Sequence, residues 1–269
     1  MAGALKKLVN DVLRCVGLEV RRRPDLSLPF IHKFALDDRE IQFWITNQHA
    51  KRWWHKPLLE MNAEFRSLKS FCIPGSTVIE VGAHHGVHTV AMGNWVGDTG
   101  HVYALEANGD NALTLYANVA LNNLNNCTCR HAVVGAVSGK IKLDGETVAT
   151  KKHTGTQTTV ISLDDYCTEF DIANVDLLKI DVEGYEAQVL KGARKIMSQR
   201  PKIALELHLD DIASYGSSVN EIAELIGIDD YYGEMMIRAK DWETLYPFQS
   251  ITDFPQSGIV NLFMIPRSP

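Results

Sequence analysis

The chain has 269 residues, of which 45% are hydrophobic and 22% are charged, with a formal net charge of −6. Such a chain is long enough for one full-sized core, and its acidic balance disfavours a dedicated nucleic-acid binder, which carries a basic face. No apolar run approaches the roughly 20 residues that span a bilayer, and no signal peptide is recognisable. The five cysteines form no paired framework. We therefore expect reduced thiols and a cytoplasmic protein.

The first 23 residues differ from the rest, because they carry an excess of basic side chains. Residues 4–16 have apolar positions at helical spacing and predict an amphipathic helix. One interpretation, which we favour, is a helix packed on the domain or on a second subunit of a homo-oligomer. The alternative is a helix lying on the inner face of the membrane as a peripheral contact.

Residues 24–73 predict a brace or lid on the main domain, with short strands over residues 30–34 and 41–45 and a helix over residues 58–71. Four aromatic side chains in this stretch either stack on a planar or sugar-like acceptor or pack the brace. They are Trp44, Trp53, Trp54 and His55.

Residues 74–269 alternate apolar strands with helical segments, which predicts a doubly wound parallel sheet with helices on both faces. The expected strands are residues 77–81, 101–105, 127–134, 175–180 and 202–207. The expected helices are residues 87–95, 110–122 and 185–199. Residues 140–161 interrupt this order and suggest a short β excursion around a polar loop.

The first strand runs into a turn with two glycines, in the sequence VIEVGAHHG over residues 78–86. Ligands of doubly wound sheets bind at the carboxyl ends of the strands, and glycines let them approach the backbone. Glu80 precedes the glycines, where a carboxylate opposes a phosphate but suits the cationic end of S-adenosylmethionine. Glu106 follows Gly86 by 20 residues. An acid there is the usual partner of ribose hydroxyls, whether the ligand is S-adenosylmethionine or NAD.

Four segments together resemble the FkbM family of methyltransferases over about residues 64–208, and more loosely over residues 259–265. They are VIEVGAHHG (78–86), LEA (105–107), SLDDY (162–166) and LKIDVEGYE (178–186). The last segment is the specific signal, whereas the glycine turn is shared by a whole superfamily. The resemblance implies a class I, Rossmann-like methyltransferase fold with a seven-stranded sheet. Its last strand is antiparallel, with residues 235–237 and 259–263 as the closing pair.

The resemblance also implies which residues hold S-adenosylmethionine. By position, the methionine part lies near the glycine turn, the ribose near Glu106, and the adenine after the third strand, while Asp181 faces the cofactor from the fourth. The implied set is Glu80, Gly82, Ala83, Gly86, Glu106, Ala107, Ala132, Val133 and Asp181. This chain departs from the family pattern by having Glu80 in place of Asp, and by the pair His84 and His85.

Methyl transfer to a hydroxyl or an amide benefits from a base that removes a proton. The candidate catalytic residues are His208, Glu183 and Asp181, of which His208 or Glu183 is the expected base. Each has a structural alternative, because Glu183 can cap the helix near Tyr185 and a lone histidine is usually structural. The acids at this edge, with Glu206 and His208, would also suit Mg²⁺ or Mn²⁺. We nevertheless expect no metal.

The resemblance implies an O-methyltransferase acting on a hydroxyl of a sugar, glycolipid or secondary metabolite. Similar proteins also suggest N-methylation of a peptide side-chain amide, so the acceptor is a small molecule, a glycan or a peptide. A nicotinamide-dependent oxidoreductase is the alternative from another enzyme class, although the dinucleotide fingerprint is absent. A partner protein that binds S-adenosylmethionine without catalysis is a further alternative.

Overall fold

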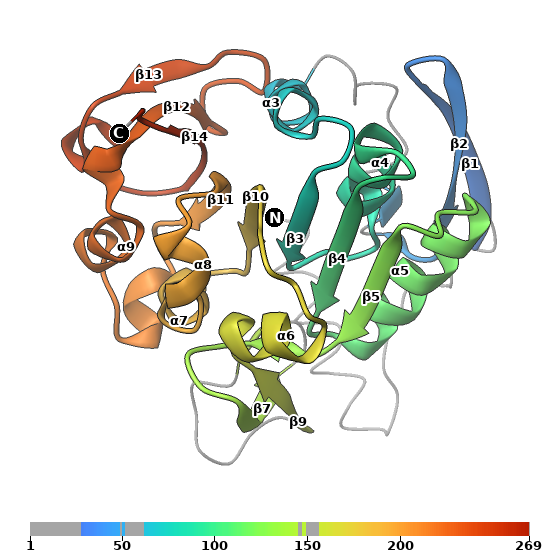
Figure 1. Cartoon of the computed structure of the whole chain (residues 1–269), viewed down its shortest axis with the longest axis horizontal. Helices are drawn as coiled ribbons and strands as arrows, with labels where there is room; N and C mark the ends of the chain where they lie inside the picture. Colours follow the sequence, from blue (N-terminus) through green and yellow to red (C-terminus); the bar gives the residue numbers. More distant parts are fainter. Residues whose placement is uncertain (1–27, 49, 52–61, 145–146, 149–155, 269) are drawn as a thin grey trace, which may run out of the picture.

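The computed structural model describes residues 28–48, 50–51, 62–144, 147–148 and 156–268 (Figure 1). The amphipathic segment at residues 1–23 lies outside the described residues, as do Trp53, Trp54 and His55. Along the described residues, no helix combines the length and the apolar character needed to cross a bilayer.

A large mixed sheet forms the centre of the described structure. Its order is β13-β12-β14-β11-β10-β3-β4-β5, with β14 antiparallel to β11 and to β12. The strands from β11 to β5 are all parallel. The expected sheet of seven strands with an antiparallel last strand is confirmed, and β13 extends one edge. The bounds are β3 Thr77–Val81, β4 His101–Glu106, β5 Cys127–His131, β10 Leu177–Asp181, β11 Lys202–His208, β12 Tyr231–Ile237, β13 Tyr246–Phe248 and β14 Ile259–Pro266.

Helices cover both faces of this sheet (Figure 1). One face carries α3 (Ala63–Phe71), α4 (Val87–Val96) and α5 (Gly109–Leu121). The other face carries α6 (Leu163–Glu169), α7 (Glu186–Lys191), α8 (Arg194–Ser198) and α9 (Val219–Ile226). Burial on both faces is the reason that the central strands are apolar throughout, instead of alternating with polar residues.

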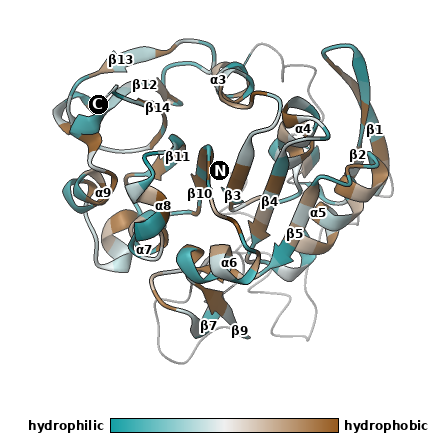
Figure 2. Cartoon of the chain, viewed as in Figure 1, coloured by the Kyte–Doolittle hydropathy of each residue, from teal (hydrophilic) through white to brown (hydrophobic). Residues whose placement is uncertain are grey.

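The side chains of the central strands form the hydrophobic core, together with the helix sides that face them. Figure 2 colours the chain by hydropathy and shows hydrophobic residues in these strands and helices. Three charged residues break this rule on the face covered by α3 and α4. Glu80, Lys179 and Glu206 lie in neighbouring strands and are all buried. Burying charges is costly unless they are paired, so these residues mark the part of the sheet where a site is built.

The N-terminal brace is represented by a hairpin of β1 (Phe30–Leu36) and β2 (Arg39–Ile45), as predicted. Two asparagines one helical turn apart, in α5 and at its C-terminal cap, bind β2, the strand of the hairpin that contacts α5. Asn118 Oδ1 accepts from the Trp44 backbone N–H at 2.6 Å, and Asn122 Oδ1 accepts from Gln42 N–H at 2.9 Å. The hairpin thus packs on the main domain, while the exact domain boundaries at residues 23 and 73 stay predictions.

Three predicted elements are wrong in extent. The helix expected over residues 58–71 begins at Ala63, because the Asn62 side chain caps it by accepting from Glu64 N–H. The third strand ends at His131, and Val133–Val134 form β6 in a separate small sheet with β7 (Gly139–Asp144), β8 (Thr147–Val148) and β9 (Thr156–Ile161). The expected helix over residues 185–199 is two helices that meet at Gly192. A Cβ at Gly192 would lie 2.2 Å from the Gly135 carbonyl oxygen, so this contact requires a glycine and the helix breaks there.

Candidate functional site

A cavity of about 660 Å³ opens at the carboxyl ends of β3, β4, β10 and β11. Its size falls within the ~300–1,000 Å³ typical of small-molecule sites. One end is lined by the glycine turn, Glu106, Ala107 and the segment 132–134. The other end is lined by His208, Arg238, Trp242 and Ile259, among others. Asp181 and Glu183 lie along the same wall, so the cavity has two ends joined through the catalytic candidates.

The glycine turn after β3 adopts a backbone that only glycine accommodates at two positions. Gly82 and Gly86 have φ of 83° and 85°, in the left-handed region. A Cβ at Gly82 would lie 1.8 Å from the Asp181 carbonyl oxygen, and one at Gly86 would lie 2.5 Å from Leu115 Cδ1. The glycines therefore press the turn against β10 on one side and α5 on the other, and this packing shapes the floor of the cavity.

Glu106 ends β4 with its carboxylate at the cavity wall. Its Oε2 accepts from the His84 backbone N–H at 2.7 Å, and its Oε1 accepts from Asn108 N–H at 2.8 Å. The residue is only 7% exposed. Glu106 thus presents a buried carboxylate, a group that accepts hydrogen bonds, at the wall of the cavity.

The two histidines of the turn have different surroundings. His85 is buried, with Nε2 at 3.1 Å from Asn111 Oδ1, and its carbonyl accepts from Asn118 Nδ2 at 2.8 Å. His85 thus ties the turn to α5. His84 lines the cavity, with its ring centroid 4.1 Å from that of His85. The pair that departs from the family pattern therefore combines an internal anchor with a cavity wall.

Glu80 lies beneath the turn and does not line the cavity. It is fully buried, and its Oε2 accepts from Thr89 Oγ1 at 2.5 Å. Lys179 Nζ lies 3.7 Å from Oε1. Burial raises the pKa of Glu80 to about 7, although Lys179 and Thr89 oppose the rise. Any influence of Glu80 on a ligand therefore passes through its neighbours.

Asp181 and Glu183 follow β10 and both line the cavity. The Asp181 side chain is 27% exposed, and Lys179 Nζ lies 3.6 Å from its Oδ2. Glu183 is exposed, with a φ of 49°. The helix near Tyr185, α7, begins at Glu186, whose own carboxylate accepts from Gly184 N–H at 3.0 Å. The capping alternative for Glu183 stays a prediction.

His208, at the end of β11, is held between two buried carboxylates. Its Nδ1 lies 3.1 Å from Glu186 Oε1 and its Nε2 lies 3.3 Å from Glu206 Oε1. Burial alone would lower the pKa of His208, but hydrogen bonds to the two acids outweigh it and raise the pKa to about 10. The imidazole is therefore protonated at neutral pH and has no lone pair with which to accept a proton.

Glu206 is engaged on its other side as well. Its Oε2 accepts from Asn261 Nδ2 at 2.8 Å and from Arg238 Nη2. The Arg238 guanidinium in turn lies over the Trp242 ring, 4.7 Å from its centroid. This far end of the cavity is therefore lined by paired charges beside one aromatic ring.

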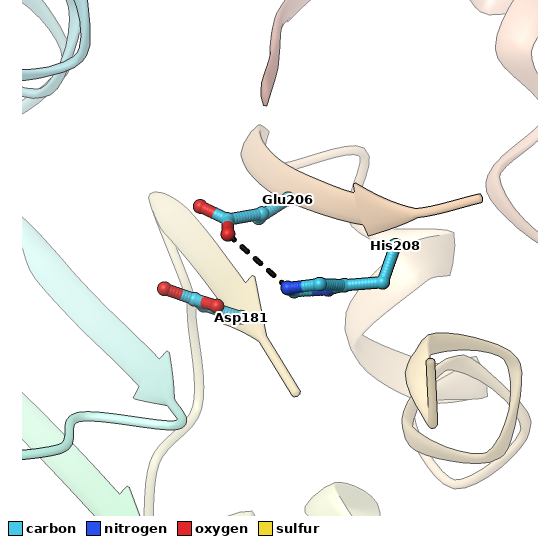
Figure 3. A group of neighbouring side chains, drawn as sticks. All are labelled: Asp181, Glu206 and His208. Atoms are coloured by element: carbon cyan, nitrogen blue, oxygen red, sulfur yellow. Dashed lines mark ion pairs between the residues drawn. The ribbon is translucent and has the colours of Figure 1, made fainter. Parts of the chain in front are cut away.

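Asp181, Glu206 and His208 form the one metal-type cluster within the described part of the chain (Figure 3). Their nearest ligand atoms all lie within 4.8 Å of one another. Two of the three are already satisfied by protein groups, since Glu206 binds Arg238 and His208 binds Glu186. The chain's own cations thus supply the charge that an ion would bring, and the absence of a metal requirement stays a prediction.

Sequence reasoning missed several residues of this site. Lys179 lies inside the most specific motif, and a lysine within an otherwise apolar strand was a usable signal. Glu186 was also in that motif. Arg238 and Trp242 follow β12, where the sequence carries no recognisable pattern, and only the fold brings them to the cavity.

Comparison with known proteins agrees with this architecture. The family model described as the methyltransferase FkbM domain matches residues 80–233, which is more than half of the chain. The chain therefore belongs to the FkbM methyltransferase family. It is an S-adenosylmethionine-dependent methyltransferase with the class I fold, and the nicotinamide alternative is set aside. No curated protein matches the chain significantly.

Solved structures with a similar fold are methyltransferases of distant sequence. Fibrillarin of Aeropyrum pernix with bound S-adenosyl-L-methionine is 13% identical, over 71% of this chain and 67% of that one, with a TM-score of 0.42. The precorrin-6y C5,15-methyltransferase of Geobacter metallireducens is 14% identical, over 76% of this chain and 88% of that one, with a TM-score of 0.44. A SAM-dependent methyltransferase of Aquifex aeolicus is 14% identical, over 81% of this chain and 97% of that one, with a TM-score of 0.44. At these identities the likeness says nothing about the acceptor.

Proposed function

We propose that this enzyme methylates a hydroxyl group of a sugar, glycolipid or secondary metabolite. The observation that supports the proposal is the second end of the cavity, where Trp242 offers an aromatic face and Arg238 and Glu206 offer a polar wall. Asp210 and Asp211 border the same end and disfavour an anionic acceptor. A neutral polyhydroxylated molecule suits an aromatic face beside paired charges. The substrate class itself rests on the family resemblance.

The first end of the cavity suits S-adenosylmethionine in its shape and its donors. We assign the ribose hydroxyls to Glu106, because its carboxylate lies at the cavity wall at the end of β4 and a carboxylate accepts hydrogen bonds from hydroxyl groups. Buried Ala132 and Val133 give an apolar wall for the adenine, with Ala107 beside the ribose. The methionine part is assigned to the turn formed by Gly82, Ala83 and Gly86. Glu80 acts there indirectly, from beneath the turn.

The bound cofactor supplies an electrophilic methyl group on a positively charged sulfur. The task left to the protein is to orient the acceptor and to take its hydroxyl proton. Asp181 is the candidate best placed for that proton, because it is a partly exposed carboxylate between the two ends of the cavity. Glu183 is the second candidate, from the rim. His208 is assigned to orientation of Glu206, because its own proton is held by two acids.

The proposal is tested by transfer of labelled methyl from S-adenosylmethionine to panels of sugars, glycolipids, hydroxylated metabolites and peptides. Label on an oxygen of a neutral hydroxyl compound is the expected result, and label on a peptide amide nitrogen would replace it by the N-methyltransferase alternative. Asp181→Asn should abolish turnover. If Asp181→Asn, Glu183→Gln or His208→Gln keeps turnover within about tenfold of wild type, that residue is not the base.

Contacts outside the cavity are proposed from the sequence. The basic residues 1–23 are assigned to a helix that packs on the domain or on a second copy of the chain, with a peripheral contact to the inner face of the membrane as the alternative. Liposome flotation of the full chain and of a variant lacking residues 1–23 tests the membrane alternative. Equal flotation of both proteins would remove the membrane contact.

A further inference from the structure

Lys179 is a buried cation that none of the roles above explains. It lies in the middle of β10, is 2% exposed, and has apolar neighbours on either side in the strand. In the sheet it stands directly opposite Glu80 of β3. Its Nζ lies 3.7 Å from Glu80 Oε1 and 3.6 Å from Asp181 Oδ2. One ammonium therefore bridges the strand of the glycine turn and the strand of the catalytic candidate.

A buried ammonium is expensive to maintain and is weak evidence of a stabilising role. Burial alone would lower the pKa of Lys179, but the surrounding carboxylates outweigh it and raise the pKa. The largest contributions come from Asp181 and Glu80, followed by Glu64 of α3 and Glu206. The side chain is consequently a fixed positive charge, placed below the floor of the cavity.

The position of Asp181 depends on this charge. Among the described residues, Lys179 is the cation with which Asp181 forms an ion pair. The Asp181 backbone is also in tight contact with the turn, as the space for a Cβ at Gly82 shows. We propose that Lys179 is a positioning residue. It holds the Asp181 carboxylate against the glycine turn and sets the charge at the end of the cavity that the glycine turn lines. This rests on the proposed role of Asp181 beside the cofactor.

The proposal predicts how the site discriminates between S-adenosylmethionine and S-adenosylhomocysteine, which differ by a methyl group and one positive charge. A cation near the sulfur disfavours the charged ligand, and an anion favours it. Removing Lys179 should therefore increase the preference for S-adenosylmethionine, and removing the Asp181 charge should decrease it. A merely structural lesion would weaken both ligands alike and leave their ratio unchanged.

Lys202 provides a matched control. It belongs to β11, on the same face of the sheet but at the opposite end from the cavity. Its Nζ donates to the Phe71 carbonyl at 3.1 Å and lies over the Phe71 ring. Lys202→Met removes a partly buried lysine of the sheet without touching Asp181 or Glu80.

The experiment measures the dissociation constants of both ligands by calorimetry on the full chain. Lys179→Met should raise the preference for S-adenosylmethionine at least about fivefold, because this is a modest Coulomb effect over several ångströms. Lys179→Arg and Lys202→Met should leave the ratio within about twofold of wild type. Lys179→Met combined with Asp181→Asn should return toward the wild-type ratio. Should Lys179→Met not fold, Lys179→Met with Glu80→Gln is compared with Glu80→Gln alone.

The failures of the two proposals are distinguishable. If Asp181→Asn lowers the ratio while Lys179→Met leaves it unchanged, the role of Lys179 is overturned and that of Asp181 stands. If Asp181→Asn leaves the ratio unchanged, the proposed place of Asp181 beside the cofactor fails. If Lys202→Met shifts the ratio as much as Lys179→Met, the effect is not specific to the bridge, and the proposal is overturned.

Discussion

The ion pairs of His208 with Glu186 and Glu206, called the His208 clamp below, predict that the folded chain loses stability at alkaline pH. This loss depends on the His208 side chain. The pKa of His208 is about 10 in the folded chain against a reference value of 6.5, because Glu186 and Glu206 bind the imidazolium. The folded state therefore holds this proton more tightly than the unfolded state. The resulting stabilisation is complete below about pH 6.5 and is lost as the pH rises through about 10.

The size of the effect follows from the shift in pKa. Each pKa unit corresponds to about 1.4 kcal/mol, so the clamp contributes on the order of 3–5 kcal/mol to the free energy of unfolding at neutral pH. His208→Gln removes the titrating group and should flatten this part of the profile. The comparison must be made between wild type and variant, because burial also raises the pKa of Cys72 and Cys127 to about 12. These thiols reduce stability above pH 9 in both proteins.

The assay is urea unfolding of wild type, His208→Gln and His131→Gln between pH 6 and pH 10. His131 is an exposed histidine whose Nε2 contacts the Ala107 carbonyl, so its replacement is a matched control. The difference in unfolding free energy between wild type and His208→Gln should shrink by a few kcal/mol across this range. Parallel curves for the two proteins would refute the protonated clamp.

Three further predictions concern the turn and its surroundings. Burial raises the pKa of Glu80 from 4.5 to about 7, so the free energy of unfolding should fall by about 3 kcal/mol between pH 4.5 and pH 7, relative to Glu80→Gln. Urea unfolding of both proteins measures this, and a constant difference between them would contradict it. Gly82→Ala should abolish cofactor binding and lower the free energy of unfolding by several kcal/mol, because the new Cβ meets the Asp181 carbonyl. The control Gly97→Ala has a φ of 65° but no atom within 4 Å of its Cβ, so it should lower the free energy of unfolding by only about 1–2 kcal/mol in thermal unfolding. Methyl transfer should be unchanged after treatment with EDTA, because Glu206 is already paired with protein cations; loss of activity restored by Mn²⁺ would reverse that conclusion.

The sheet and the cofactor turn could be predicted because their signals are local. Strands that are apolar on both faces, such as those at Val78 and Leu178, are typical of a covered parallel sheet. The glycines at 82 and 86 mark a turn by their conformational freedom. The motif around Asp181 then indicated the family, and the structure places its residues at the cavity.

The chemistry of the site was not predictable, since it depends on contacts between distant segments. Glu80 was expected beside the ligand, but pairing of β3 with β10 puts it opposite Lys179 and buries both. His208 or Glu183 was expected to be the base, and nothing in the sequence indicated that Glu186, from the start of α7, contacts the His208 ring. Likewise, the helix break at Gly192 follows from a contact with Gly135, which no local pattern announces.

The central claim is that the cavity above the glycine turn binds S-adenosylmethionine through Glu106. Calorimetric titration with S-adenosylhomocysteine and with NAD⁺ tests it most directly, on wild type, Glu106→Gln and the exposed control Asp110→Asn. We expect one S-adenosylhomocysteine per chain, no binding of NAD⁺, and a loss of at least about tenfold in affinity for Glu106→Gln alone. Binding of NAD⁺ without S-adenosylhomocysteine, or unchanged affinity in Glu106→Gln, would contradict the account.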